Sequence, residues 1–302
     1  MPSNIAETLL LLRRLLLALL CAVVVALMAD AAAAQHTYAT PAAAADAFTD
    51  ALQRNDHELM RTVLGSDWKT FIPTDDVNRQ DIDKFLDAWK QSHRVDVAGE
   101  RAVVVVGDQG WTLPVPLVKT AAGWQFDTRA GADAMRTRRI GRNELAAMQA
   151  TLAYFDAQQD YARRDRDSDG VLQYAQQFAS TPGKHDGLYW TTSGDEPLSP
   201  LGSLFTSPKT EEGYVGYRYK ILKGQGKDAP GGAYSYLIGD RMVSGFALLA
   251  SPLRYGDTGV MSFMINHDGQ LFEKNLGADT AAVAASMTLF DPDASWRKVS
   301  PP

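Results

Sequence analysis

GFALLASPLRYGDTGVMSFMINHDG, residues 245–269, holds two apolar runs separated by a polar turn. The first run begins just before the quoted stretch, at Met242, and extends to Ala250. The second run extends from Gly259 to Asn266, and each run has the length of a β-strand. Asp268-Gly269 ends the second run as a turn, and Leu271-Phe272 follows as the hairpin partner. The second run and Leu271-Phe272 are therefore predicted to form an antiparallel hairpin.

The rest of the C-terminal half has the same character. It is rich in Gly, Tyr and turn pairs, and Tyr217–Ile221 alternates as a strand does. A short helix is expected over 279–290. We therefore predict a C-terminal, mainly antiparallel β domain over 166–302.

A long helix is predicted before this domain, over 131–165, where it would connect two domains. Its apolar face carries Ile140, Leu145, Met148, Leu152 and Phe155 at helical spacing. Gly131 and Gly141 are expected to break its start.

Residues 35–130 predict three helices followed by a curved antiparallel sheet. The first two helices begin at Thr40-Pro41 and at Asn55-Asp56, because these residues suit helix N-termini. The third is predicted from about Arg79 to Gln91, where one face carries Ile82, Phe85, Leu86 and Trp89. The strands are expected at 101–106, at 111–118 and at 124–126, and Pro114 and Pro116 place the second one at a sheet edge. The fold class is α+β, since no β-α-β alternation occurs.

Two fold resemblances accompany this order of elements. The helices followed by a strand with the sequence GWQFD, residues 123–127, resemble NTF2-like domains. The C-terminal part, ending near TGVMSFMINHDGQL at 258–271, is similar to the globular heads of type IV pilin-like proteins. The chain departs from pilins because it lacks the prepilin leader and the Glu that follows it.

The N-terminus has the pattern of a cleavable secretory signal. Arg13 and Arg14 precede an apolar run over 15–27, and Ala32-Ala33-Ala34 provides a small-residue cleavage site. We predict a signal peptide over 1–34, a periplasmic or secreted location and no membrane span after cleavage; an uncleaved anchor is the alternative. The one cysteine, Cys21, lies within this segment, so the mature chain has no thiol. A net charge of −6 argues against binding to nucleic acid.

Several longer motifs are identified as those of one family. They are HDGLYW (185–190), GYRYKILKGQGKDAPGGAYSY (216–236), the 245–269 stretch and FEKNLG (272–277). IGRNELAAMQATLAYFDAQQDYA at 140–162 fits the same family. Together they resemble the DUF2950 family, and the resemblance implies a bacterial exported protein without indicating its activity.

An acidic loop at 165–170, DRDSDG, matches the first half of an EF-hand loop. Asp165, Asp167 and Asp169 alternate, so their carboxylates can converge on one calcium ion, with the Val171 carbonyl as a further ligand. Gln176 replaces the usual glutamate, which predicts weak affinity, and a helix is expected over 173–179. The alternative is a solvated acidic turn. No cofactor is required; calcium is the one that the sequence suggests.

Aromatic side chains suggest a second kind of site in the C-terminal domain. A groove for sugars or peptides can be lined by tyrosine and tryptophan, which have an apolar face and a polar tip. Ordinary sheet packing is the alternative. The candidates are Tyr189, Trp190, Tyr217, Tyr219, Tyr234 and Tyr236.

No catalytic residue is assigned from the sequence. It has no G-x-S-x-G, no H-E-x-x-H and no complete P-loop, because Asp228 follows the GQGK at 224–227. The His-Asp-Gly triplets at 185–187 and 267–269 are interpreted as turns. We therefore expect a non-catalytic binding or scaffolding module of the cell envelope with an unknown partner; the alternative is a hydrolase of envelope material that uses unidentified carboxylates.

Overall fold

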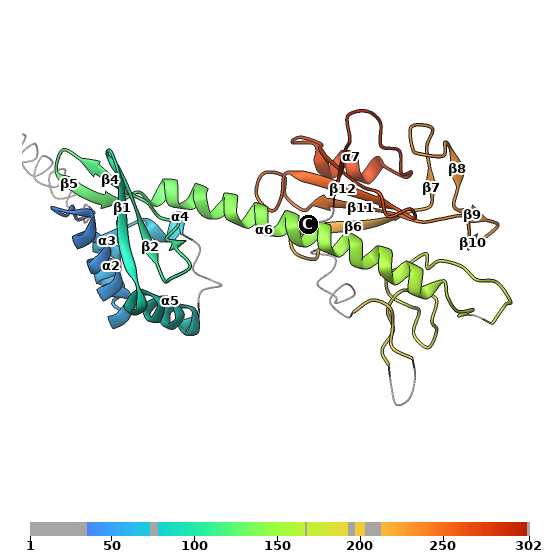
Figure 1. Ribbon diagram of the computed structural model, residues 1–302, viewed down its shortest axis with the longest axis horizontal. Helices are drawn as coiled ribbons and strands as arrows, with labels where there is room; N and C mark the ends of the chain where they lie inside the picture. Colours follow the sequence, from blue (N-terminus) through green and yellow to red (C-terminus); the bar gives the residue numbers. More distant parts are fainter. Residues whose placement is uncertain (1–34, 73–77, 167, 193–196, 203–212, 301–302) are drawn as a thin grey trace, which may run out of the picture. The chain divides into compact units, whose positions relative to one another are not determined.

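The computed structural model describes residues 35–72, 78–166, 168–192, 197–202 and 213–300. The predicted signal peptide, 1–34, lies outside these residues. The chain divides into two compact units, residues 1–135 (unit 1) and 136–302 (unit 2), which are drawn in Figure 1. No helix among the described residues is both long and apolar enough to cross a membrane.

Local capping residues set the helices of unit 1. The Thr40 hydroxyl accepts from the Ala43 N–H, and Asp56 accepts from the N–H groups of Glu58 and Leu59. Asn78 and Asp81 form a capping box, which explains the helix predicted near Arg79. The helices are α2 (Pro41–Arg54), α3 (His57–Leu64), α4 (Trp68–Phe71) and α5 (Arg79–Gln91).

Five antiparallel strands form the sheet of unit 1, in the order β1-β2-β4-β5, with β3 paired to β2. Their bounds are β1 (His93–Ala98), β2 (Arg101–Val106), β3 (Trp111–Thr112), β4 (Leu117–Thr120) and β5 (Gly123–Phe126). The prediction of one edge strand over 111–118 is wrong. Pro114 and Pro116 interrupt the run, and β4 then pairs with both β2 and β5. Strand β1 was not predicted.

The long helix α6 extends over Thr128–Tyr161, so it begins and ends a few residues before the predicted 131–165. The Asp127 carboxylate accepts from the Ala130 N–H at 2.9 Å and caps its start. Neither Gly131 nor Gly141 breaks the helix. Gly131 instead lets α6 approach Val115 closely, because a Cβ at this position would lie 2.9 Å from a Val115 methyl carbon.

Unit 2 contains a five-stranded antiparallel sheet in the order β14-β13-β12-β11-β6. The central strand is β12, in which Ile265 lies opposite Leu271 and Met264 opposite Phe272 of β13, which confirms the predicted hairpin. On its other side β12 pairs with β11, which also pairs with β6. The α+β fold class is confirmed. The strands are β6 (Tyr217–Leu222), β11 (Ala247–Pro252), β12 (Met261–Asn266), β13 (Leu271–Asn275) and β14 (Arg297–Val299). Helix α7 covers Thr280–Ser286, and two-residue strands form the pairs β7 (Gly224–Gln225) with β8 (Tyr234–Ser235) and β9 (Leu237–Ile238) with β10 (Arg241–Met242).

The described residues between α6 and β6 contain no helix beyond α6, so the helix predicted over 173–179 is wrong. This part of the chain is held by partners distant in sequence. Gln158 on α6 is fully buried, accepts from the Ala175 N–H at 2.8 Å and donates to the Ala175 carbonyl at 2.7 Å. Tyr174 forms a β-bridge with Met242. These bonds satisfy backbone groups that a helix would have satisfied locally.

Gly131 and Gly141 both lie in α6, so replacing each with alanine changes helix propensity by the same amount and the two variants differ in packing alone. Gly131→Ala should destabilise unit 1 by about 1–3 kcal/mol, because the new methyl group overlaps Val115. Gly141→Ala should stabilise the chain by about 0.5–1 kcal/mol, because no atom would lie within 4 Å of the new Cβ and alanine favours the helix. Urea unfolding followed by circular dichroism measures both. Stabilisation by both substitutions would contradict the close α6 contact.

Candidate functional site

A cavity of about 850 Å³ in unit 1 is the strongest candidate for a binding site. Its volume lies within the range of about 300–1,000 Å³ that is typical of small-molecule sites. Helices α2 to α5 and the residues around β3 form its walls, and Met135 of α6 also contributes. The apolar lining comprises Phe48, Ala51, Leu52, Met60, Leu64, Trp68, Ile72, Ile82, Phe85, Ala88, Val106, Trp111, Leu113, Pro114, Val115 and Met135.

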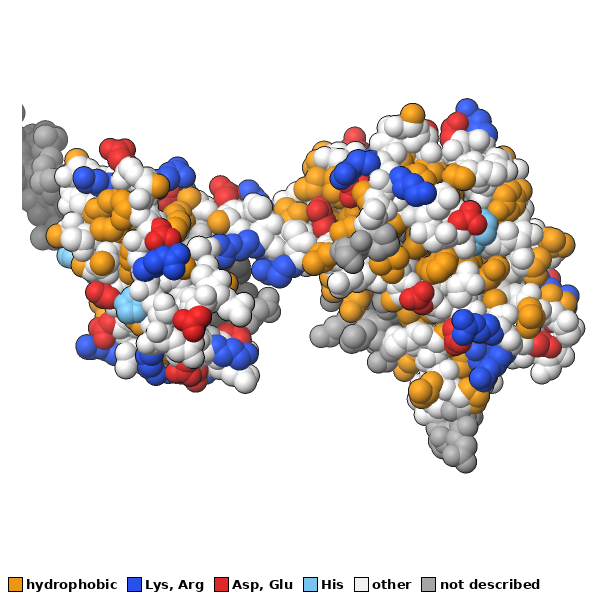
Figure 2. Space-filling view, viewed as in Figure 1, with side chains coloured by type: hydrophobic (Ala, Val, Ile, Leu, Met, Phe, Trp, Pro, Cys, Tyr) orange, Lys and Arg blue, Asp and Glu red, His pale blue; other side chains and the backbone are white. Residues whose placement is uncertain are grey.

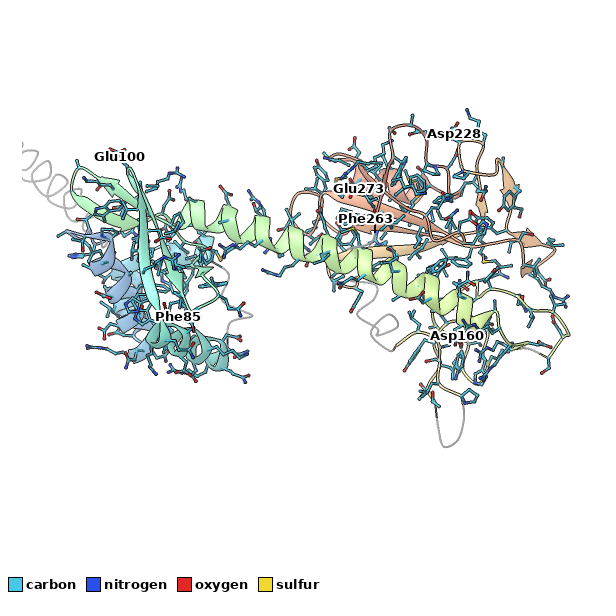
Figure 3. All side chains as sticks on the ribbon, viewed as in Figure 1. Phe85, Glu100, Asp160, Asp228, Phe263 and Glu273 are labelled. Carbon is cyan, nitrogen blue, oxygen red and sulfur yellow. The ribbon has the colours of Figure 1, made fainter. Side chains whose placement is uncertain are left out.

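Aromatic rings organise one wall of the cavity. Phe85, labelled in Figure 3, lies on α5 with its ring centroid 6.1 Å from that of Phe48 and 6.2 Å from that of Trp111. Both contacts have the edge-to-face geometry that aromatic pairs favour. Phe85 and Ile82 are only half-buried, and Trp111 is exposed. The helices thus leave apolar surface that the sheet does not cover.

The charged residues of the lining are mostly engaged with neighbours. Asp56 caps α3 and Asp81 belongs to the capping box of α5. Arg79 pairs with Asp83 at 2.9 Å, and Lys84 pairs with Asp81 at 3.6 Å. Figure 2 shows basic and acidic side chains mixed over the visible face of unit 1. Such an arrangement gives no extended basic surface for a polyanion on that face.

Two adjacent residues of the lining differ from the others. The Trp68 ring is buried, and its indole N–H has no acceptor among the described residues. Lys69 is exposed, with its ammonium group 5.6 Å from the centroid of the Trp68 ring. No carboxylate of the described residues pairs with Lys69. A buried N–H without an acceptor is unfavourable, so this position is suited to a hydrogen-bond acceptor from elsewhere.

Two carboxylates of the acidic loop, those of Asp165 and Asp169, are engaged by other groups of the protein. Asp165 accepts from the N–H groups of Asp169 and Gly170, and Asp169 accepts from the Val171 N–H and pairs with Arg241 at 2.5 Å. Asp167 lies outside the described residues.

Gln176, the residue expected at the last ligand position, is engaged away from the loop. It donates to the Asp240 carbonyl and accepts from Lys223. No group of three or more acidic, His or Cys side chains among the described residues is placed to hold a metal ion. Calcium binding by Asp165, Asp167, Asp169, Val171 and Gln176 stays a prediction, and the cation would compete with Arg241 for Asp169.

The predicted aromatic surface is largely inside the protein. Tyr217 and Tyr236 are fully buried, and their hydroxyls donate to the Met261 carbonyl and to Gln225. Burial raises the pKa of both hydroxyls well above the ordinary value, as it does for the partly buried Tyr219. These phenols therefore remain neutral hydrogen-bond donors. Of the candidates in the 234–236 segment, Tyr234 alone is exposed.

Trp190 also has a structural role. It is buried, its indole N–H donates to the Pro197 carbonyl, and the Arg166 guanidinium lies 5.2 Å from its ring centroid. Arg166 lies 5.5 Å from the Tyr161 ring as well. Tyr189 is half-buried and its backbone pairs with Phe178 and Ser180. The six aromatic candidates consequently do not form one exposed groove.

Both His-Asp-Gly triplets are turns with internal partners. Asp186 accepts from the Thr181 N–H at 2.7 Å, the Thr181 hydroxyl at 2.8 Å and the Gln177 amide at 2.9 Å. His267 Nε2 lies 3.2 Å from the Tyr234 hydroxyl, while its Nδ1 is buried without a partner among the described residues. A Cβ on Gly245 would lie 2.8 Å from this Nδ1, so the glycine allows the chain to pack closely against the ring.

The glycine-rich loop at 224–228 holds an anion that the chain itself supplies. The Asp228 N–H donates to the Asp291 carboxylate at 2.8 Å. A Cβ on Gly226 would fall within 2.6 Å of the same carboxylate, which explains the glycine. Asp291 therefore occupies the position that a phosphate would need, in agreement with the interpretation as a hairpin loop.

A family model described as a protein of unknown function (DUF2950) matches residues 35–299. The chain belongs to the DUF2950 family. No curated protein and no solved structure matches it. The motifs quoted at 140–162, 185–190, 216–236 and 272–277 all fall inside the matched range of this DUF2950 member.

Sequence reasoning missed the cavity of this DUF2950 member although it identified most of the helix faces that line it. Phe85 and Ile82 were assigned to an apolar helix face, and such a face predicts burial without indicating what it is buried against. Trp111 gave no usable signal in the sequence, because its exposure after the Gly110 turn is seen only in the structure.

The Asp186 turn predicts an acid-sensitive contribution to the stability of unit 2. Burial alone would raise the pKa of Asp186, but the bonds from Thr181 and Gln177 outweigh it and hold the pKa below its ordinary value. The stabilisation is therefore present above the unfolded value of about 3.9 and is lost as the pH falls through the lower folded value.

Asp186→Asn should accordingly flatten the fall in melting temperature below about pH 4. Thermal unfolding between pH 2.5 and 7 measures this. Asp279→Asn is the control, since the Asp279 side chain makes no capping bond. Equal pH profiles for wild type and Asp186→Asn would contradict the assigned role.

Proposed function

We propose that this DUF2950 member is a non-catalytic binding protein that takes up a small apolar molecule in the cavity of unit 1. The observation that supports the proposal is the cavity itself, with its predominantly apolar walls and a volume of about 850 Å³. Burial of apolar ligand surface contributes roughly 25 cal/mol per Å², so a ligand that fills such a cavity gains most of its affinity from the hydrophobic effect.

Binding is favoured over the alternative of hydrolysis by the roles of the nearby acids. Asp56 and Asp81 line the cavity, and a hydrolase of envelope polymers would need such a pair as acid and base. The Asp56 carboxylate accepts from the N–H groups of Glu58 and Leu59, and the Asp81 carboxylate accepts from the Asn78 N–H, so both have structural roles at helix N-termini. The described polar groups at the cavity therefore support recognition better than proton transfer.

The proposal includes export to the periplasm or the exterior and a partner in the cell envelope. The basic, apolar and small-residue pattern over 1–34 supports export. The net charge of −6 supports a partner other than nucleic acid. The order of helices followed by an antiparallel sheet in unit 1 supports an NTF2-like fold, and the sheet of unit 2 supports the looser pilin-like comparison.

Filling the cavity tests the proposal. N-phenyl-1-naphthylamine, a neutral apolar fluorophore, should bind the folded chain at micromolar concentration with increased emission. Leu52→Trp places a larger side chain in the lining and should weaken this binding at least tenfold. Gln53→Trp, at an exposed neighbouring position outside the lining, should leave the binding unchanged. Binding that is absent in wild type, or equal in both variants, would reject the cavity as the site.

The expected export has its own measurement. Intact mass of the protein recovered from the envelope fraction of its source cells should correspond to a chain that begins at Gln35. Ala34→Leu should retain the precursor, because signal cleavage requires small residues at this site. A recovered chain that still contains residues 15–27 would favour the uncleaved anchor.

A further inference from the structure

We infer that the cavity ligand is an amphiphile with a single alkyl chain and an anionic head group, and that Lys69 and Trp68 bind the head group. This inference rests on the proposed function and names the ligand class. Apolar walls alone would accept any small hydrophobic molecule. The distribution of charge and of unsatisfied polar groups at the cavity narrows the choice.

The lining contains three cationic side chains, and two of them already have carboxylate partners. Arg79 pairs with Asp83, and Lys84 pairs with Asp81. Lys69 lines the cavity but pairs with no carboxylate among the described residues. An anion entering the cavity would therefore meet one cation that forms no ion pair within the described part of the chain.

The second observation is the neighbouring indole of Trp68. Its N–H is buried and has no acceptor among the described residues, although the residue lines the same cavity. Buried donors are almost always satisfied in folded proteins, so an unsatisfied one calls for a partner. A carboxylate or phosphate oxygen can accept from this N–H and lie near the Lys69 ammonium, because that ammonium is 5.6 Å from the centroid of the Trp68 ring.

The acids of the lining do not oppose this assignment. Asp56 and Asp81 are held by helix N-terminal N–H groups, which partly neutralise them. A neutral head group would gain no charge–charge attraction from Lys69, and a cationic one would be repelled by it. The geometry thus points to an anionic head with an alkyl tail along the wall formed by Phe48, Phe85 and Trp111.

Calorimetric titration with two ligands of equal chain length tests the inference. Dodecanoate should bind wild type about two- to tenfold more tightly than dodecan-1-ol, below the micellar concentration, because a solvent-accessible ion pair adds a modest free energy. Lys69→Met should remove this preference by weakening dodecanoate and leaving dodecan-1-ol unchanged. Lys84→Met, which removes a cation already paired with Asp81, should keep the preference. Dodecyl phosphate in place of dodecanoate distinguishes a phosphate head from a carboxylate.

Each result has a distinct meaning. Equal binding of dodecanoate and dodecan-1-ol to wild type would overturn the inference and leave the cavity function standing. Loss of the preference in Lys84→Met alone would overturn the assignment to Lys69. Failure of both ligands and of the neutral fluorophore would reject the proposed function itself. Trp68→Phe keeps the aromatic ring and removes the N–H, so dodecanoate should bind this variant more weakly; unchanged binding would remove Trp68 from the site.

Discussion

The corner between α2 and α3 is the constraint on which the unit 1 cavity depends. Asn55 adopts the left-handed conformation, with φ of 52°, and ends α2. Asp56 follows at once as the N-cap of α3. Asparagine is among the few residues that accept this conformation without glycine, and its neighbour satisfies the first N–H groups of the next helix. The tight corner turns Leu52 of α2 and Met60 of α3 toward the same space, where they line the cavity.

Sequence reasoning succeeded wherever the signal was local. The starts of α2 and α3 follow from capping residues at Thr40 and Asp56, α5 follows from its apolar spacing, and β2 begins and ends as its β-branched run predicts. Strand β1 escaped prediction although Val95 and Val97 alternate with Arg94 and Asp96, because this alternation is short and both faces of the strand are largely exposed. The end of α6 was placed too late, because polar residues after Tyr161 can continue a helix as readily as they can end it.

Candidate sites were harder to predict because their partners are distant in the sequence. The acidic loop has calcium-like spacing, yet Arg241 pairs with Asp169 and Asp240 engages Gln176. The glycine-rich loop has the donors for an anion, yet Asp291 supplies that anion. Local spacing indicates what a loop is able to bind. Which group occupies it is set by tertiary contacts that composition and periodicity do not encode.

The same limitation explains why an apolar helix face did not reveal a cavity. Pro114 and Pro116 were interpreted as marks of an edge strand, whereas they interrupt the strand and place Leu113, Pro114 and Val115 in the cavity wall. Leu113 remains tied to the sheet through the bond from its N–H to the Val104 carbonyl, and Val115 is pressed against Gly131 of α6. The Leu113 bond and the close packing of Val115 against Gly131 therefore fix this part of the cavity wall. Under the proposed function, a ligand that covers the apolar surface of this wall would lower its free energy.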